Sequence, residues 1–215
     1  MYRNRQPSID NRQFIVFEGG EGSGKSTAAE AVAGRLRASG RDVVLTREPG
    51  GTRAGELVRG LLHEQLAPWA EAFAFLVARA QIVAEVIRPA LERDALVICD
   101  RFEASFFAYQ GFARGLDFDK LVQSNAAATG GLSPGLTVWL DIDPAAGLAR
   151  KLGEHEAIRT GLETLDFHTK VRESYRAQME AAPHGSWVII DAALPPGDVA
   201  GRAVAAVEHW LAASR

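Results

Sequence analysis

The chain has 215 residues, of which 47% are hydrophobic and 24% charged, and its formal net charge is −3. A chain of this size can bury the core of one globular domain, and its charge balance gives no basic surface for nucleic acid. Cys99 is the only cysteine, which excludes an intramolecular disulfide, and no apolar run is long enough to cross a membrane. These features favour a cytoplasmic enzyme that has neither nucleic acid nor a membrane as a partner.

Residues 1–12 are polar and lack the apolar core of a signal peptide, so we predict a flexible tail ahead of a single domain over residues 13–215. The arginines of this stretch are also a feature of transit peptides, but the stretch is short and contains Asp10. The chain has no internal repeat and no sign of a second domain.

The first predicted element of the domain is a buried strand, residues 14–17, that leads into a glycine-rich loop. Residues 19–27, GGEGSGKST, match the P-loop pattern GxxxxGK(S/T) at every required position, and a helical pattern follows. This order of strand, loop and helix distinguishes a phosphate-binding P-loop from a structural glycine turn. The expected ATP-binding residues are Gly19, Gly20, Glu21, Gly22, Ser23, Gly24, Lys25, Ser26 and Thr27.

The residue types of this loop explain its chemistry. Backbone N–H groups and the positive end of the following helix form an anion site. Lys25 can reach the β- and γ-phosphates, and the Ser26 hydroxyl can occupy one position of a magnesium ion, which uses few protein ligands.

A second predicted strand, residues 42–46, runs into Arg47 and a PGG turn, after which Thr52 can cap a helix that continues through His63. Arg47 is thereby placed at the C-terminal end of a strand, where ligands bind in open α/β sheets. The alternative interpretation is an ordinary surface arginine.

A long helical pattern covers residues 69–93, with a kink predicted at Pro89. Phe75 and Arg79 are four residues apart and hence share one helix face. Phe75 lies off the main apolar stripe, but the sequence alone favours a place in the core. The stripe consists of Phe73, Leu76, Val77, Ala80, Val83, Ala84 and Ile87.

A third buried strand, residues 95–99, ends at Asp100 and Arg101. A carboxylate directly after a buried strand is typical of the second half of a P-loop site, where it holds magnesium directly or through water. Arg101 can bind a phosphate with two N–H groups, although a salt-bridged pair at a strand end is the alternative. An aromatic helix follows and is predicted to end at Gly111.

Two more strands, residues 136–141 and 187–190, complete a set of five. Five apolar strands separated by helices predict an α/β fold with a parallel sheet and helices on both faces. Residues 153–162 have weak periodicity and are predicted to form a mobile segment. The other helices are predicted at residues 117–129, from Pro144 onward, at residues 163–181 and at residues 196–211.

Five segments stand in the order found in one enzyme family: FEGGEGSGKST, TREPGGT, DRFEASFFAYQG, LTVWLDIDPAAGLAR and VIIDA. The chain resembles the thymidylate kinases, which are nucleoside monophosphate kinases, over about residues 14–211. A lone P-loop is shared by many enzymes, whereas these motifs together are far more specific. The resemblance implies a P-loop kinase fold, phosphorylation of dTMP to dTDP with ATP, a need for Mg²⁺, and a homodimer.

The resemblance also implies roles on the acceptor side. Arg47 and Arg101 would hold the acceptor phosphate, Phe75 would stack on thymine, and Arg79 would reach a base carbonyl. In the P-loop, Glu21 would lie near the 3′-hydroxyl of the acceptor sugar. The implied substrate-binding residues are Glu21, Arg47, Phe75, Arg79, Arg101, Ser105, Tyr109 and Gln110, with Tyr109 crowding the 2′ position.

On the donor side, Arg150 would lie near the adenine of ATP. The variable P-loop positions carry no basic residue, and in this family such a P-loop goes with a catalytic arginine in the lid, here about residues 153–162. Arg159 is the expected catalytic arginine, because negative charge spreads over the γ-phosphoryl oxygens during transfer. The expected catalytic residues are Lys25, Asp100, Arg101 and Arg159, and the expected metal ligands are Ser26 and Asp100.

Two positions depart from the family pattern. Phe106 replaces a residue that is commonly small or polar, so another pyrimidine deoxynucleotide stays open as the acceptor, and Ile158 precedes Arg159 where an aspartate is usual. A deoxynucleoside kinase would need a base such as Asp100 near the 5′-hydroxyl. A GTPase switch would need an NKxD motif, which the sequence lacks, and an inactive P-loop scaffold is the remaining alternative.

Overall fold

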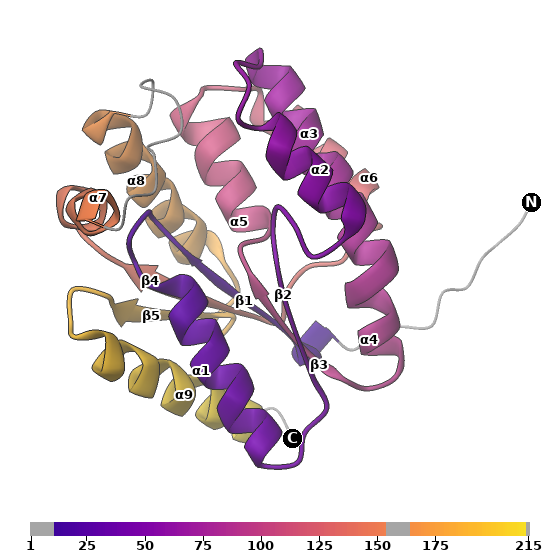
Figure 1. Cartoon of the computed structure of the whole chain (residues 1–215), viewed down its shortest axis with the longest axis vertical. Helices are drawn as coiled ribbons and strands as arrows, with labels where there is room; N and C mark the ends of the chain where they lie inside the picture. Colours follow the sequence, from indigo (N-terminus) through magenta and orange to yellow (C-terminus); the bar gives the residue numbers. More distant parts are fainter. Residues whose placement is uncertain (1–10, 154–163, 214–215) are drawn as a thin grey trace, which may run out of the picture.

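A five-stranded parallel sheet forms the centre of the structure, a computed structural model that describes residues 11–153 and 164–213 (Figure 1). The strand order is β2–β3–β1–β4–β5, and every neighbouring pair is parallel. The predicted α/β fold is thereby confirmed. The strands are β1 (Phe14–Gly19), β2 (Val43–Arg47), β3 (Leu96–Asp100), β4 (Leu136–Asp141) and β5 (Trp187–Asp191).

Helices follow the strands and cover the sheet. A short 3-10 helix, η1 (Asn11–Gln13), precedes β1, and two π-helical segments, η2 (Val83–Ile87) and η3 (Phe107–Ala113), interrupt longer helices. The α-helices are α1 (Lys25–Ala38), α2 (Arg53–Leu61), α3 (Pro68–Ile82), α4 (Arg88–Glu92), α5 (Glu103–Phe106), α6 (Phe118–Thr129), α7 (Pro144–Gly153), α8 (Leu165–Ala181) and α9 (Pro196–Ala213).

Alternate side chains of each strand point to opposite faces of the sheet, and helices bury both faces. On one face, Ile15 and Phe17 of β1 pack with α1 and α9. On the other face, Phe14 and Val16 pack with η2 and α4, while Trp139 of β4 packs with α8. Figure 1 shows these layers on the two sides of the sheet.

The register of the strands brings their carboxyl ends to one edge of the sheet. Phe17 and Arg47 both stand opposite Asp100, and Gly19 stands opposite Leu140. The P-loop after β1 therefore opens on the same edge as the ends of β2 and β3. This is the edge where open α/β sheets bind their ligands.

The long helical pattern at residues 69–93 forms three helical segments, since α3 passes into η2 before α4 begins. Proline has no backbone N–H, and a π-helical turn alters the hydrogen bonding just before Pro89. The chain stays helical from residue 68 to residue 92 through this π-helical turn, and the kink at Pro89 stays a prediction.

The apolar stripe predicted for this region is only partly correct. Leu76 and Ile87 are buried as predicted, whereas the side chains of Phe73 and Val77 are 53% and 56% exposed. The reason is that the neighbours of α3 contact its small residues, and Ala74 and other alanines are buried in place of the aromatic ring.

The aromatic helix predicted to end at Gly111 continues through η3 to Ala113. A Cβ at Gly111 would lie 3.2 Å from Phe118 and 3.3 Å from Leu121. This glycine therefore allows η3 to pack closely on α6 and does not end the helix. The predicted cap at Thr52 is confirmed, because its hydroxyl accepts the Gly55 N–H at 2.9 Å.

Most of the predicted N-terminal tail, residues 1–10, lies outside the described residues, and Asn11–Gln13 form η1 beside Gly135. Within residues 11–153 and 164–213, no helix combines the length and the apolar character needed to cross a membrane.

Candidate active site

The P-loop folds back on the side chain of Lys25, the first residue of α1. Lys25 Nζ donates to the Gly20 carbonyl at 2.7 Å and lies 3.3 Å from Ser23 Oγ. Burial lowers the pKa of the Lys25 ammonium to about 8, and the nearby charge of Arg101 acts in the same direction. A buried cation beside a helix N-terminus is suited to bind an anionic phosphate.

Ser26 links the P-loop to the end of β3. Its hydroxyl donates to Asp100 Oδ2 at 2.5 Å. The second carboxylate oxygen, Asp100 Oδ1, is buried and has no hydrogen-bond partner among the described residues. A hydroxyl and an unsatisfied carboxylate oxygen are donors that a hard divalent cation prefers, and one carboxylate is a usual number for such a site.

Arg101 lies across the P-loop in the left-handed region, with φ of 68°. Its Nη1 donates to the Gly19 carbonyl at 3.3 Å, and its Nη2 pairs with Glu21 Oε1 at 2.9 Å. Burial alone would raise the pKa of the Glu21 carboxyl, but the charges of Arg101, Lys25 and Lys151 hold it well below its usual range. A guanidinium is thus fixed beside the phosphate-binding loop.

Two cations of α7 face different parts of the site. Arg150 donates to the carbonyl oxygens of Ala192 and Ala193, in the loop after β5, at 2.7 and 3.1 Å. Lys151 pairs with Glu21 Oε2 at 2.8 Å. Consequently Arg150 is turned away from the P-loop, and Lys151 is turned toward it.

Arg79, on α3, lies in a buried polar cluster with Glu48 and Asn125. Its Nε is 2.9 Å from Glu48 Oε2, and its Nη1 donates to Asn125 Oδ1 at 2.9 Å. The guanidinium carbon lies 4.8 Å from the ring centre of Phe102 and 5.2 Å from that of Phe106. Only 3% of the Arg79 side chain is exposed, so its charge depends on Glu48 for compensation.

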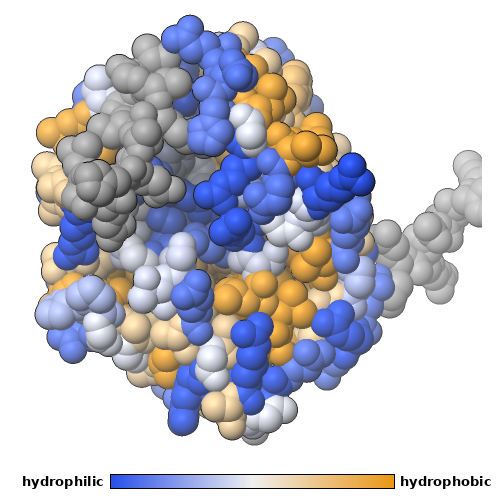
Figure 2. Space-filling model, in the orientation of Figure 1, coloured by the Kyte–Doolittle hydropathy of each residue, from blue (hydrophilic) through white to orange (hydrophobic). Residues whose placement is uncertain are grey.

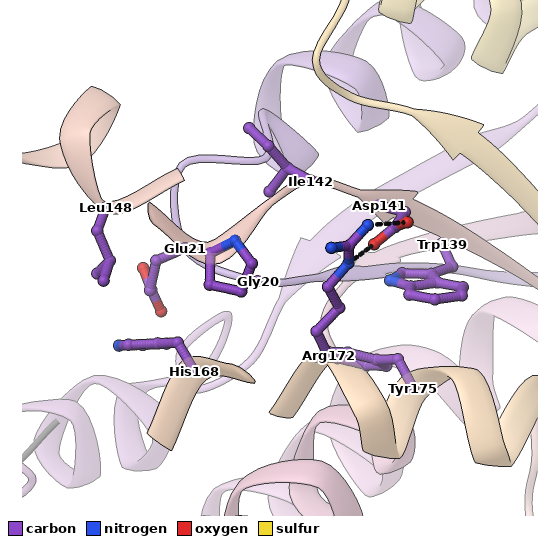
Figure 3. A pocket seen from close by; sticks show the side chains of 10 residues that line it. Gly20, Glu21, Trp139, Asp141, Ile142, Leu148, His168, Arg172 and Tyr175 are labelled. Carbon is purple, nitrogen blue, oxygen red and sulfur yellow. Dashed lines mark hydrogen bonds and ion pairs between the residues drawn. The ribbon is translucent and has the colours of Figure 1, made fainter. Parts of the chain in front are cut away.

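A small cavity of about 10 Å³ lies behind the P-loop, between Glu21, His168 and Trp139 (Figure 3). Arg172 closes it with two hydrogen bonds to Asp141, at 2.6 and 2.8 Å. Such a volume holds one water at most. This cavity is therefore too small to hold a nucleotide.

Comparisons with known proteins agree with this geometry. A family model described as thymidylate kinase matches residues 17–202. The chain belongs to the thymidylate kinase family. A thymidylate kinase of Desulfovibrio desulfuricans is 48% identical over 209 residues, which cover 92% of this chain and 96% of that protein.

Other members of the thymidylate kinase family give the same result. One from Roseiflexus is 43% identical over 215 residues, covering 93% of this chain and 95% of its own length. A crystal structure of thymidylate kinase from Ehrlichia chaffeensis matches with a TM-score of 0.76 at 30% identity, covering 92% of this chain and 98% of the other. The relatives thus span nearly the whole chain.

The structure brings most of the phosphate-side residues expected of a thymidylate kinase together at the P-loop. Ser105 Oγ lies 3.2 Å from Arg101 Nη1, and the Tyr109 hydroxyl lies 3.4 Å from Glu21 Oε1. The catalytic prediction for Arg159 concerns a residue outside the described part of the chain.

Three other predicted substrate-binding residues lie apart from the P-loop cluster. Arg47 is exposed and pairs with Glu56 at 3.3 Å. Phe75 is partly buried where α3 meets α2 and α6, which agrees with the core position expected for it from the sequence alone. Gln110 donates to Glu71 Oε1 at 3.0 Å. Their roles toward substrate stay predictions.

The sequence interpretation missed Glu18, the residue just before the P-loop. Its carboxylate accepts the backbone N–H groups of Phe102 and Ser105, at 2.9 and 3.1 Å, and also bonds to the Ser105 and Tyr175 hydroxyls. Burial raises the pKa of Glu18. The carboxylate holds the loop after Arg101 against β1, and a charged residue within an apolar strand was the signal that could have found it.

Removing Arg79 is expected to destabilise the fold strongly. Arg79→Met leaves the Glu48 carboxylate buried without its cation, which should lower the free energy of unfolding by about 3–5 kcal/mol. Urea unfolding of the nucleotide-free protein measures the loss. Arg35→Met is the control, because the exposed Arg35–Glu208 pair, 2.9 Å apart, should contribute about 1 kcal/mol or less. Equal losses in the two variants would contradict the prediction.

Proposed function

We propose that the chain transfers the γ-phosphoryl group of ATP to the 5′-phosphate of dTMP, giving dTDP for the synthesis of dTTP. Membership of the thymidylate kinase family supports the reaction. The observation that carries it at the site is the fixed contact of Arg101 with Gly19 and Glu21 of the P-loop. Arg101 would bind a second phosphate beside the donor site. A nucleotide kinase needs such a cation because its acceptor already carries a phosphate, whereas a nucleoside kinase does not.

The chemistry rests on positioning and charge, because phosphoryl transfer leaves little covalent work for the protein. Donor and acceptor phosphates repel each other, so cations must hold them in line. Lys25 binds the donor phosphates, Arg101 and Arg47 bind the acceptor phosphate, and Arg150 lies toward the adenine. Arg159 supplies the lid guanidinium that stabilises the transferring group.

Ser26 and Asp100 would hold a magnesium ion, and their oxygen atoms fit that role as described above. When bound, the ion neutralises charge on the nucleotide phosphates. Among the described residues, no group of three or more His, Cys, Asp or Glu side chains is placed to bind a metal. A site with one carboxylate agrees with a cation that keeps most of its waters.

Replacing Asp100 with asparagine is expected to lower activity by about ten- to a hundredfold and to raise the magnesium concentration needed for half-maximal rate. The amide keeps the size of the side chain but removes its charge. Titration of the rate with Mg²⁺ at saturating nucleotides measures both effects. Asp166→Asn, at an exposed position of α8, is the control. Full activity of Asp100→Asn at low magnesium would leave Asp100 as a structural partner of Ser26 only.

On the base side, we assign thymine to the pocket of Phe75 and Arg79. Glu48 and Asn125 fix the Arg79 guanidinium from two sides, which supports a constant donor position. Phe106 lies under Arg79 and is buried. Because Phe106 stands where the family commonly has a small or polar residue, the selectivity for the base stays open, and dUMP is the second candidate acceptor.

The test is a substrate panel with purified protein and Mg²⁺·ATP. The panel contains dTMP, dUMP, dCMP and thymidine, and the products are separated by chromatography. Formation of dTDP at the highest kcat/KM supports the proposal. Phosphorylation of thymidine without dTMP would identify a nucleoside kinase, and no turnover of any acceptor would identify an inactive scaffold.

The enzyme acts as a homodimer in the cytoplasm in this proposal. Helices α2 and α6 both pack on α3, and each of the three helices exposes an apolar pair at i, i+4 spacing, a pattern that forms one helix face. Figure 2 shows hydrophobic residues on the side where α2 and α3 lie. The pairs are Leu57 and Leu61 on α2, Phe73 and Val77 on α3, and Phe118 and Val122 on α6.

Light scattering after size exclusion tests the dimer. The parent should have twice the chain mass of 23.2 kDa, and Phe73→Asp should shift it to a single chain, because a charge in an apolar interface is costly. Leu165→Asp is the control, since Leu165 is 51% exposed at the start of α8, away from these helices. A parent of single-chain mass would contradict the proposal.

A further inference from the structure

Lys151 belongs to a helix that is anchored directly on the P-loop. A Cβ added at Gly22 would lie 2.1 Å from the Gly147 carbonyl oxygen, and one added at Gly147 would lie 2.3 Å from the carbonyl oxygen of Glu21. Only glycine fits at both positions. The backbone of α7 is therefore held at close range to the backbone of the phosphate-binding loop.

Helix geometry carries this contact from the backbone to the lysine. Gly147 and Lys151 are four residues apart on α7, so they share one face of the helix. Because Gly147 contacts the P-loop, Lys151, one helical turn later, also faces the P-loop, where it pairs with Glu21. Figure 3 shows Leu148 of α7 and His168 of α8 on either side of Glu21.

The carboxylate of Glu21 is consequently held at both oxygens. Oε1 pairs with Arg101 at 2.9 Å and lies 3.4 Å from the Tyr109 hydroxyl, whereas Oε2 pairs with Lys151 at 2.8 Å. The cations come from elements on opposite sides of the loop. Two-sided pairing fixes the rotation of a carboxylate, which a single partner leaves free to turn.

The lysine is largely enclosed, since 16% of its side chain is exposed, against 21% for Glu21. A surface pair in the same chain, Lys170 with Asp166, has the same separation of 2.8 Å but is 47% and 73% exposed. Exposed pairs contribute little because solvent screens them. Because the Lys151–Glu21 pair is partly buried, it can hold the Glu21 side chain in one rotamer, whereas the exposed Lys170–Asp166 pair cannot hold its carboxylate in this way.

We propose that Lys151 is a positioning residue that holds Glu21 in place to accept the 3′-hydroxyl of the acceptor sugar. The inference rests on the proposed function, which puts Glu21 beside that hydroxyl. Each carboxylate oxygen has two lone pairs, so Oε2 can accept the sugar hydroxyl while Lys151 binds it. The lysine thereby sets the preference for an acceptor that carries a 3′-hydroxyl.

The readout is the ratio of kcat/KM for dTMP to that for 2′,3′-dideoxythymidine 5′-monophosphate, which lacks the hydroxyl. The hydrogen bond from the 3′-hydroxyl to the charged Glu21 carboxylate should make this ratio about ten or more in the parent enzyme. Glu21→Gln should reduce this ratio. Lys151→Met should reduce it by about three- to tenfold, mainly by raising the KM for dTMP, and Lys151→Arg should retain most of it.

Two further variants sharpen the test. Lys170→Met removes the equally close surface pair and should leave the ratio unchanged. In the double variant Glu21→Gln/Lys151→Met, loss of the lysine should lower the ratio no further than Glu21→Gln alone, because the lysine acts through the carboxylate. Thermal unfolding of each variant confirms that it is folded.

The outcomes separate this inference from the proposed function. If Glu21→Gln reduces the ratio and Lys151→Met does not, the role of Lys151 is overturned and the function stands. If Lys151→Met lowers kcat/KM equally for both acceptors, the positioning role of Lys151 is also overturned, because the defect would then not depend on the 3′-hydroxyl. A parent enzyme that does not phosphorylate dTMP would overturn the function and this role together.

Discussion

Replacing Lys25 with methionine is expected to lower kcat/KM for dTDP formation by about 10³-fold. The Gly20 carbonyl holds the ammonium in the P-loop. The proposed function assigns this charge to the donor phosphates, where negative charge develops during transfer. Methionine has a similar length and no charge, so it removes that stabilisation without leaving a large cavity. A loss of this size corresponds to about 4 kcal/mol of transition-state stabilisation.

Stability measurements distinguish this catalytic role from a structural one. Lys25 is a buried cation whose charge is costly to desolvate, so its removal should change the free energy of unfolding by about 1 kcal/mol or less. Lys170→Met serves as the control for loss of a lysine at the surface. A Lys25→Met variant that retains activity within tenfold of the parent would remove Lys25 from the catalytic set.

The phosphate side of the site was predictable because its signals are local in the sequence. The residues from Gly19 to Thr27 match one pattern, and Asp100 with Arg101 directly follows an apolar strand. In a parallel sheet, consecutive strand–helix units bring such strand ends to one edge. The contact between Ser26 and Asp100 therefore follows from topology, although the two residues are 74 positions apart.

The base side was less predictable because its key contacts are long-range and satisfy buried charges. Arg79 on α3 meets Glu48 after β2 and Asn125 on α6, and no pattern in the sequence links these positions. Similarly, Glu18 bonds to a loop 84 residues further along the chain. A buried charge demands a partner, but the sequence alone does not say which one.

The left-handed conformation of Arg101 illustrates the same difficulty. A non-glycine residue in this region costs about 1–2 kcal/mol, so neighbours must hold it there. Its own N–H donates to Phe17 at 2.9 Å, its carbonyl accepts the Cys99 thiol at 3.1 Å, and Glu18 binds the next N–H along the chain. Cys99 is thus buried as predicted and also contacts this loop.

Arg159 is the catalytic arginine that we propose for the phosphate site. Among the described residues, the guanidinium of Arg101 is directed to Glu21 and Gly19, and that of Arg150 to the loop after β5. Lys151 is engaged by Glu21 and lacks the planar fork that binds two phosphoryl oxygens. Among the described residues, α7 therefore directs no guanidinium at the P-loop, and Arg159 is the arginine that the sequence offers next.

Replacing Arg159 with alanine is therefore expected to lower kcat by about 10³-fold or more with little change in either KM, as for a lost arginine finger. Arg150→Ala should instead raise the KM for ATP, because the proposed function assigns Arg150 to the adenine side of the nucleotide. Arg176→Ala, at an exposed position of α8, controls for loss of a surface arginine. The prediction is contradicted if kcat of Arg159→Ala stays within a few-fold of the parent while kcat of Arg150→Ala falls by about 10³-fold. The catalytic guanidinium would then belong to Arg150. Binding of ATP would have to release that guanidinium from the carbonyl oxygens of Ala192 and Ala193.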